Sequence, residues 1–205
     1  MTPSTATADG TAFVAPDELS GAVTAVTELL DHGHRRIGFI SLAAPGPATD
    51  GRLRGYRDTL AAAGIPFDPD LVEFEHSDAS GGYHATRRLL ELADPPTGIF
   101  CFNDEMAMGA YRAAAERGLA IPGGLSVVGY DDLDLVASSL SPGLTTVALP
   151  HYDMGALARE LLLEQTGDLH VGDRAAGRAT QVHMRCPLVR RGSVGPPPVN
   201  SRGVS

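Results

Sequence analysis

Short apolar runs alternate along this chain with longer segments whose apolar residues recur at helical spacing, and this alternation limits the fold more than any other feature. Apolar runs of this length with few polar positions are typical of parallel strands buried on both faces. The predicted strands are residues 36–42, 71–76, 98–102, 125–130, 144–147 and 181–189. The predicted helices are residues 20–32, 50–63, 82–92, 104–117 and 152–165. The pattern predicts an α/β fold, a doubly wound parallel sheet with helices on both faces.

The length and composition indicate one ordered globular region with loose ends. A chain of 205 residues has room for one full domain, or about one and a half. Apolar residues make up 43% and charged residues 20%, which excludes disordered and fibrous chains. Residues 1–12 are predicted to be a flexible leader, and residues 192–205, rich in Pro and Gly, a disordered tail.

The net charge of the chain argues against nucleic-acid binding by these residues alone. Acidic residues number 25 and basic residues 16, all of them Arg, for a net charge of −9. Binding to a phosphate backbone requires a clustered positive surface, and the excess of acidic over basic residues disfavours such a surface. The first ten residues lack the basic and apolar regions of a signal peptide, and no run is apolar and long enough to span a membrane. We therefore expect a cytoplasmic protein with no membrane partner.

The residues that usually carry catalysis or bind metals are absent or wrongly spaced. Cys101 and Cys186 lie far apart in apolar surroundings, and the histidines show no metal-binding spacing, so we expect no metal and no cofactor. No dinucleotide-binding glycine motif, phosphate-binding loop or nucleophile elbow occurs, so we expect no enzyme and no catalytic residues. The acidic cluster of Asp131, Asp132 and Asp134 leaves open a Mg²⁺-dependent enzyme as an alternative.

Polar residues that follow the predicted strands are the candidates for a binding site. The carboxyl ends of parallel strands meet at one edge of a sheet, where ligands bind in open α/β folds. Arg52, Asn103 and Asp131 come after three of these strands, and Leu149 and His151 follow a fourth. A guanidinium, a carboxamide and a carboxylate together match the hydroxyl groups of a neutral polyol, which predicts a sugar site.

Each of these polar residues also has a purely structural interpretation. Arg52 fits an exposed helix face beside Arg54 and Arg57. Asn103 fits the N-cap of the helix that begins at the next residue, and Asp131 or its neighbour fits the cap of a short turn.

A series of motifs, in a shared order, resembles the sugar-sensing core of the LacI/GalR transcriptional regulators, over about residues 13–194. In chain order they are Val14 with Asp17; Gly21-Ala22 and Leu29; Gly33-His34-Arg35-Arg36-Ile37; Arg52 with Gly55-Tyr56; Pro96-Thr97; Asn103-Asp104, Ala107 and Gly109-Ala110; Gly118-Leu119 with Ile121-Pro122; Leu125-Ser126-Val127-Val128-Gly129-Tyr130-Asp131-Asp132; Pro142 with Leu144-Thr145-Thr146-Val147; Pro150 and Gly155; and Leu188-Val189 with Arg191 and Ser193. Several motifs in one order are far more specific than any one of them.

The resemblance implies a periplasmic-binding-protein-like core with a ligand in the cleft between two lobes. Residues 13–150 and 180–191 would form the C-terminal lobe, and residues 151–179 would be a remnant of the N-terminal lobe. The ligand-binding residues implied are Arg52, Asn103, Asp131, Leu149, His151 and Asp17. Ser77 falls where some members place an aromatic residue that stacks on the sugar, so the effector need not be a simple hexose.

The same resemblance implies a dimeric repressor or activator that binds a small effector, such as a sugar. Operator DNA would be a partner only through a helix-turn-helix, which does not precede residue 13 in this chain. Most of the N-terminal lobe is missing too, on the order of 150 residues by the family pattern. Because the chain contains about half of the two lobes that enclose the ligand, the 205 residues alone are expected to bind sugar weakly or undetectably.

Two further interpretations remain open beside the regulator and the enzyme. One is a stand-alone solute-binding protein for sugar transport, which would need an export signal. The other is a structural or dimerisation remnant without a ligand, for which apolar helix surface, such as Val23 with Val26 or Leu161 with Leu162, would form a partner face.

Overall fold

The computed structural model describes residues 13–166 and 180–198, which divide into two compact units. The larger unit contains residues 18–149 and 186–198, and the smaller contains the other described residues. The predicted division gave residues 13–17, 150 and 180–185 to the larger part, whereas in the structure they belong to the smaller unit. Predictions for residues 1–12, 167–179 and 199–205 concern positions outside the described residues.

The larger unit is built on a six-stranded sheet in the order β3-β2-β4-β5-β6-β8. Its strands are β2 (Ile37–Leu42), β3 (Val72–Glu75), β4 (Gly98–Cys101), β5 (Ser126–Asp131), β6 (Thr145–Ala148) and β8 (Leu188–Val189). The first five in this order are parallel, and β8 pairs antiparallel with β6 at the edge. The order reverses between β2 and β4, so the topological switch point lies between these two strands.

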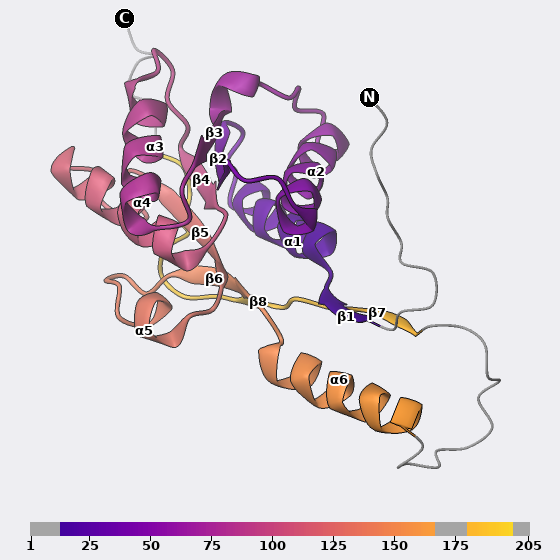
Figure 1. Cartoon of the computed structure of the whole chain (residues 1–205). Helices are drawn as coiled ribbons and strands as arrows, with labels where there is room; N and C mark the ends of the chain where they lie inside the picture. Colours follow the sequence, from indigo (N-terminus) through magenta and orange to yellow (C-terminus); the bar gives the residue numbers. More distant parts are fainter. Residues whose placement is uncertain (1–12, 167–179, 199–205) are drawn as a thin grey trace, which may run out of the picture. The chain divides into compact units, whose positions relative to one another are not determined.

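Helices cover both faces of this sheet, which confirms the predicted doubly wound fold. The helices of the larger unit are α1 (Glu18–Asp31), α2 (Pro47–Ala62), α3 (Ala79–Glu91), α4 (Asp104–Glu116) and α5 (Asp134–Ala137), with a short 3₁₀ turn at Pro69–Leu71. Helices α1 and α2 pack together on one face, and α3 and α4 pack together on the other (Figure 1). Among the described residues, none of the helices combines the length and the apolar character that a bilayer crossing requires.

The sheet core consists of aromatic and branched side chains from adjacent strands. Phe39 on β2 and Phe100 on β4 stack with ring centroids 4.8 Å apart, and both side chains are fully buried. Tyr130 on β5 continues this aromatic layer, 6.3 Å from Phe100 between ring centroids. Burial of these rings, together with the more numerous aliphatic side chains of the core, stabilises the fold through the hydrophobic effect.

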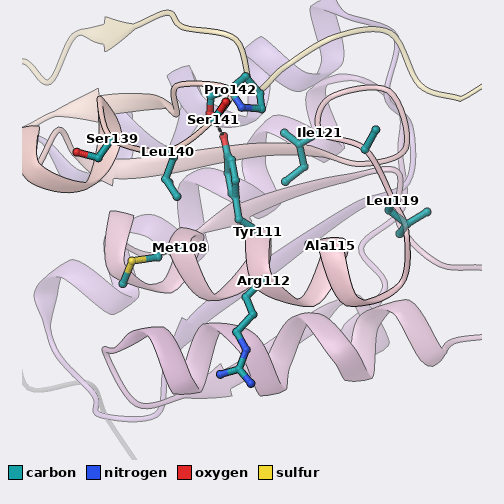
Figure 2. A pocket seen from close by; sticks show the side chains of 11 residues that line it. Met108, Tyr111, Arg112, Ala115, Leu119, Ile121, Ser139, Leu140, Ser141 and Pro142 are labelled. Atoms are coloured by element: carbon teal, nitrogen blue, oxygen red, sulfur yellow. Dashed lines mark hydrogen bonds between the residues drawn. The ribbon is translucent and has the colours of Figure 1, made fainter.

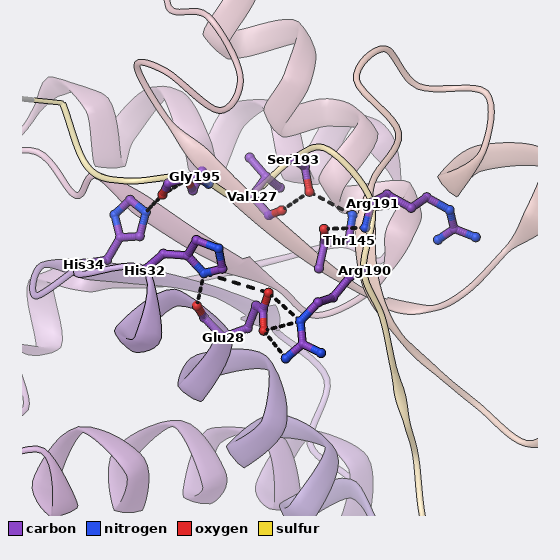
Figure 3. A network of polar contacts seen from close by, with 10 residues as sticks. Glu28, His32, His34, Val127, Thr145, Arg190, Arg191, Ser193 and Gly195 are labelled. Carbon is purple, nitrogen blue, oxygen red and sulfur yellow. Dashed lines mark hydrogen bonds and ion pairs between the residues drawn. The ribbon is translucent and has the colours of Figure 1, made fainter.

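The segment of residues 190–195, which we term the C-terminal strap, is tied across the larger unit (Figure 3). Arg190 binds Glu28 of α1 through Nε and Nη2, the latter at 2.7 Å from Oε2. The Ser193 hydroxyl donates to the Val127 carbonyl at 2.6 Å, and the ring Nε2 of His34 donates to the Gly195 carbonyl at 2.9 Å. Buried backbone groups require such partners.

The predicted disordered tail is therefore wrong for residues 192–198. Its Pro and Gly content suggested a loose end, but Ser193 is fully buried and receives a hydrogen bond from the Thr145 amide at 2.8 Å. Hydrogen bonds to the strands, which composition does not reveal, order this part of the chain.

The smaller unit pairs two chain segments that are distant in the sequence. Strand β1 (Phe13–Pro16) lies parallel to β7 (Gln181–Met184), and helix α6 (His151–Thr166) belongs to the same unit. The predicted single strand 181–189 is two strands in two different sheets. Pro187 lies between them and lacks the backbone N–H that a continuous ladder would use.

We predict that His34 makes the fold less stable as the pH falls. Burial lowers the pKa of His34 below its ordinary value of 6.5, and its ring is held in the neutral form, with Nδ1 accepting from the Thr97 hydroxyl. The unfolded chain then binds a proton at a higher pH than the folded chain. This contribution to stability is present above about pH 6.5 and is lost as the pH falls below it.

Urea denaturation at two pH values measures this effect. Between pH 7.5 and pH 5.5, the His34→Asn variant should lose less stability than the unchanged chain, because the titrating group is gone. The His84→Asn variant, at an exposed position of α3, is the matched control and should behave as the unchanged chain does. Equal losses in all three proteins would contradict the prediction.

Candidate functional site

The candidate site lies at the carboxyl edge of the sheet in the larger unit, beside the topological switch point. Strands β2, β4 and β5 all end at this edge because they are parallel. Three of the predicted residues come from the segments that leave it: Arg52 from α2, Asn103 from the start of α4 and Asp131 from the end of β5. Ligands bind at this place in open α/β sheets.

Arg52 is buried at 3% exposure and joins several parts of the edge. Its Nε donates to Glu18 Oε2 of α1 at 2.8 Å, and its Nη1 donates to the backbone carbonyl of Phe102. The guanidinium carbon also lies 3.6 Å from the centre of the Tyr130 ring. The interpretation of Arg52 as an exposed helix residue is therefore wrong, because the side chain points inward and its charge is paired.

Asp131 faces Arg52 from the other side of the edge. Its Oδ1 lies 3.9 Å from Arg52 Nη2, which is an ion-pair distance but too long for a direct hydrogen bond. Burial raises the pKa of Asp131 to about 6, although the Arg52 charge acts in the opposite direction. Asp131 thus keeps acceptor oxygens and Arg52 keeps donor N–H groups that a ligand hydroxyl can bind.

The backbone at Asp131 turns sharply as β5 ends. Asp131 has φ = 107° and Asp132 has φ = 54°, both on the positive side that residues with a Cβ seldom adopt. Asp132 forms an ion pair with Arg191 at 2.8 Å, and the Leu149 amide donates to the Asp131 carbonyl at 3.4 Å. Strain of this kind is concentrated at functional sites and persists only where the surroundings impose it.

Asn103 serves as the helix cap that one interpretation of the sequence gave it. Its Oδ1 accepts from the Met106 amide at 2.8 Å, and its Nδ2 donates to Ser77 Oγ at 2.7 Å. The amide is 6% exposed, and each of its polar atoms has capacity for one more hydrogen bond. Ser77, the position that the family resemblance singled out, thus lies directly beside Asn103.

The six predicted residues are divided between the two units of the structure. Leu149 lies in the larger unit, half-buried against the core. Asp17 and His151 belong to the smaller unit, where the Asp17 amide donates to the Met184 carbonyl at 2.8 Å and His151 begins α6 with an exposed side chain. The ligand-binding roles of all six residues stay predictions.

Two acidic residues at this edge were missed by sequence reasoning. Glu18 binds Arg52, and Asp104 is fully buried behind the turn after β5, where burial raises its pKa to about 7. The sequence could have identified Asp104 as a candidate, because it follows the same strand as Asn103. No sequence pattern pointed to Glu18. Its contact with Arg52 joins α1 to α2 through two residues that lie 34 positions apart in the sequence.

The acidic residues at the end of β5 are paired with arginines. Asp131 faces Arg52, and Asp132 binds Arg191, so both carboxylates are next to a cation. Within the parts of the chain that the structure describes, no group of three or more His, Cys, Asp or Glu side chains is arranged to hold a metal ion. This pairing suits a hydroxyl ligand better than a divalent cation.

A groove of about 600 Å³ lies along α4 and includes none of the six predicted residues. It extends from Met108 on α4 to Ile121 and Pro142 in two connecting segments (Figure 2). The Tyr111 hydroxyl donates across it to the Pro142 carbonyl at 2.9 Å, whereas Arg112 extends away toward α3. The lining is mainly apolar, unlike the charged edge of the sheet.

Comparison with known proteins shows which protein family this sequence matches. Residues 26–194 match the model of the periplasmic binding protein-like domain. The chain is 39% identical over 177 residues to the HTH-type transcriptional repressor CytR of Escherichia coli, covering 86% of this chain and 50% of that protein. The chain spans about half the length of the curated relatives it matches.

Solved structures agree with the sequence relatives. The transcriptional regulator CelR in complex with cellobiose superposes with a TM-score of 0.82 at 31% identity, covering 93% of this chain and 56% of that one. A LacI family regulator from Enterococcus faecalis with bound ribose gives 0.78 at 28% identity, covering 92% and 66%.

We predict that Asp131 lowers the stability of the fold as the pH rises. Its pKa of about 6 lies above the ordinary value of 3.8, so the folded chain keeps a proton that the unfolded chain has lost. The associated stability is present below about pH 4 and is lost as the pH rises through 6. From pH 4 to pH 7, Asp131→Asn should lose less stability in urea titrations than the unchanged chain.

Asp50→Asn, at an exposed position of α2, is the control for this comparison. It should follow the unchanged chain at every pH. The prediction fails when Asp131→Asn and Asp50→Asn show the same pH dependence.

Proposed function

Because the chain belongs to the periplasmic binding protein-like domain family, in the branch of the LacI/GalR transcriptional regulators, we propose that its carboxyl edge binds a polyhydroxylated effector, such as a sugar. The observation that carries this proposal is the facing pair of Arg52 and Asp131, with Nη2 and Oδ1 3.9 Å apart. A hydroxyl oxygen placed beside both groups accepts from the guanidinium and donates to the carboxylate.

The neighbouring residues suit the same ligand class. Asn103 presents an amide that both donates and accepts, and the hydroxyl of Ser77 lies beside it as a further hydrogen-bonding group. The Phe102 ring packs under the Arg52 guanidinium at 4.1 Å and adds an apolar surface next to the polar groups. Sugars present such alternating hydroxyl groups and apolar ring faces. Structures similar to this chain contain ribose or cellobiose.

The proposal for the whole protein follows from its relatives. It assigns operator binding to a helix-turn-helix outside these 205 residues, and it places the regulator in the cytoplasm, where its operator is. Effector binding would change operator affinity by favouring one of two arrangements of the protein. The role proposed for this chain is binding rather than catalysis, in keeping with the acidic side chains paired to arginines.

We predict that ribose or cellobiose, added at millimolar concentration, shifts the NMR amide signals of residues at the carboxyl edge, those of Asn103 and Asp131 first. Protein-observed NMR suits the weak affinity expected of this chain alone. Arg52→Lys should weaken the response by about tenfold or more, because a lysine cannot reproduce the planar donors of arginine. Arg54→Lys, on the exposed side of the same helix, is the matched control and should respond as the unchanged chain does.

Two results contradict this proposal. In one, neither sugar shifts any signal at the carboxyl edge. In the other, the shifts occur equally in Arg52→Lys or are confined to the groove along α4.

We also infer that the regulator is a homodimer. Large apolar side chains of the larger unit are exposed, with Met108 at 40% and Leu135 at 89%. Such side chains are candidates for contact with a second copy. The face predicted from Val23 with Val26 is not available, because Val26 is fully buried, whereas Leu162 of the other predicted pair is 63% exposed.

Sedimentation velocity tests the dimer. The chain should sediment as a dimer at tens of micromolar and dissociate on dilution, and Met108→Glu should shift it toward the monomer, because a charge at an apolar interface costs free energy. Arg54→Glu, at an exposed position of α2, should leave the equilibrium unchanged. A monomer at every concentration would contradict the inference.

A further inference from the structure

Asp104 is a buried carboxylate that the proposed binding site does not use directly. It opens helix α4, immediately after Asn103, and its side chain is turned into the protein with no exposed surface. Oδ1 accepts from the Thr146 hydroxyl of β6 at 2.6 Å, and Oδ2 accepts from the Leu133 amide at 2.8 Å. The carboxylate thus links α4, β6 and the turn that follows β5.

The sheet leaves a space for this carboxylate. Gly129 on β5 pairs in register with Thr146 on β6, and a Cβ at position 129 would overlap Asp104 Oδ1. The absence of a side chain at Gly129 therefore lets the Asp104 carboxylate lie against the strand that leads to Asp131. A buried carboxylate has a large desolvation cost, which the two hydrogen bonds only partly offset.

The turn that Asp104 contacts is the one that carries Asp131. Asp131 and Asp132 both have positive φ, and the next residue, Leu133, donates its amide to Asp104. Two successive left-handed residues with side chains are unfavourable unless surrounding contacts impose them. Asp104 supplies one such contact from behind the turn, and the ion pair of Asp132 with Arg191 supplies another from the C-terminal strap.

We propose that Asp104 is the residue that positions Asp131 for effector binding, acting through the turn of residues 131–133 and without touching the effector. The inference rests on the proposed function, because it takes Asp131 as an effector ligand. Without the Leu133–Asp104 hydrogen bond, the turn relaxes and the Asp131 carboxylate leaves its place 3.9 Å from Arg52. Asp104 is thus a positioning residue, and Asp131 is the residue in contact with the effector.

Charged groups around Asp104 make the position sensitive to pH. Burial, and then the charges of Asp131 and Asp132 in the turn, raise the pKa of Asp104 to about 7. The buried Cys101 thiol of β4 faces Asp104, and so does the uncharged Thr146 hydroxyl of β6. Arg52 is paired with Asp131, and Arg191 is paired with Asp132, so neither cation is paired with Asp104. Glu105, which follows Asp104 in α4, is exposed. The turn is therefore held by a charge-assisted hydrogen bond above neutral pH and by a weaker one below it.

The experiment compares Asp104→Ala and Asp104→Asn with the control Glu105→Gln, an exposed acid at the next position of α4. Amide hydrogen exchange at Leu133 reports the turn, and a carboxyl NMR titration reports the surroundings of Asp131. In Asp104→Ala, Leu133 exchange should accelerate about tenfold or more. The pKa of Asp131 should fall toward 3.8 as its side chain enters solvent. The control should leave Leu133 exchange unchanged and should lower the pKa of Asp131 only slightly, because the Glu105 charge is the smallest of the causes that raise it.

The Asp104→Asn variant still tests the proposal if the alanine variant does not fold. The asparagine oxygen can still accept from the Leu133 amide, and Thr146 can accept from its amide group. This variant should keep the turn but lose its pH response. Leu133 exchange, corrected for its intrinsic rate, should slow from pH 6 to pH 8 in the unchanged chain and remain flat in Asp104→Asn.

Sugar titration separates the two ideas. With ribose and cellobiose as probes, Asp104→Ala should bind at least about tenfold more weakly, and Asp104→Asn within about threefold of the unchanged chain at pH 7.5. If the unchanged chain binds neither sugar while the turn responds as described, the proposed function fails and the structural role of Asp104 stands. If sugar binds equally to Asp104→Ala, or if Leu133 exchange and the Asp131 titration are unaltered in the variants, the positioning role is overturned.

Discussion

The burial of the Arg52 guanidinium is the interaction on which the carboxyl edge of the sheet depends. Its partners come from three places: Glu18 at the start of α1, the Phe102 carbonyl after β4 and Asp131 after β5. Burying a cation is costly unless it is paired and hydrogen-bonded, and apolar replacements for buried ion pairs are often as stable. Stability alone does not require this pair, which agrees with the binding role that we propose for it.

The rest of the edge arranges groups around that cation. Asn103 caps α4 and contacts Ser77, while the strained turn after β5 presents Asp131. The turn is held from behind by Asp104 and from the side by Arg191 of the C-terminal strap. A site built on helix starts and strand ends is more rigid than one built on long loops, and rigid placement of donors and acceptors is what distinguishes one polyol from another.

Sequence patterns predicted the sheet and its helices well because apolar periodicity depends on neighbouring residues. The convergence of Arg52 with Asp131 was also predictable, because parallel strands end at one edge. The Glu18 contact and the order of the strap were not, since both depend on contacts between distant segments: Ser193 lies 66 positions from the carbonyl it binds. Strand β1 was missed for the same reason, because its only ladder partner, among the described residues, is β7 near the far end of the chain.

The central claim is that a polyhydroxylated molecule lies between the Arg52 guanidinium and the Asp131 carboxylate. A crystal structure of the protein grown with a saturating concentration of ribose or cellobiose tests it most directly. The account predicts electron density for the sugar with hydroxyl oxygens about 2.7–3.0 Å from Arg52 Nη2 and Asp131 Oδ1. Sugar bound elsewhere, with these two side chains still facing only each other, would contradict it.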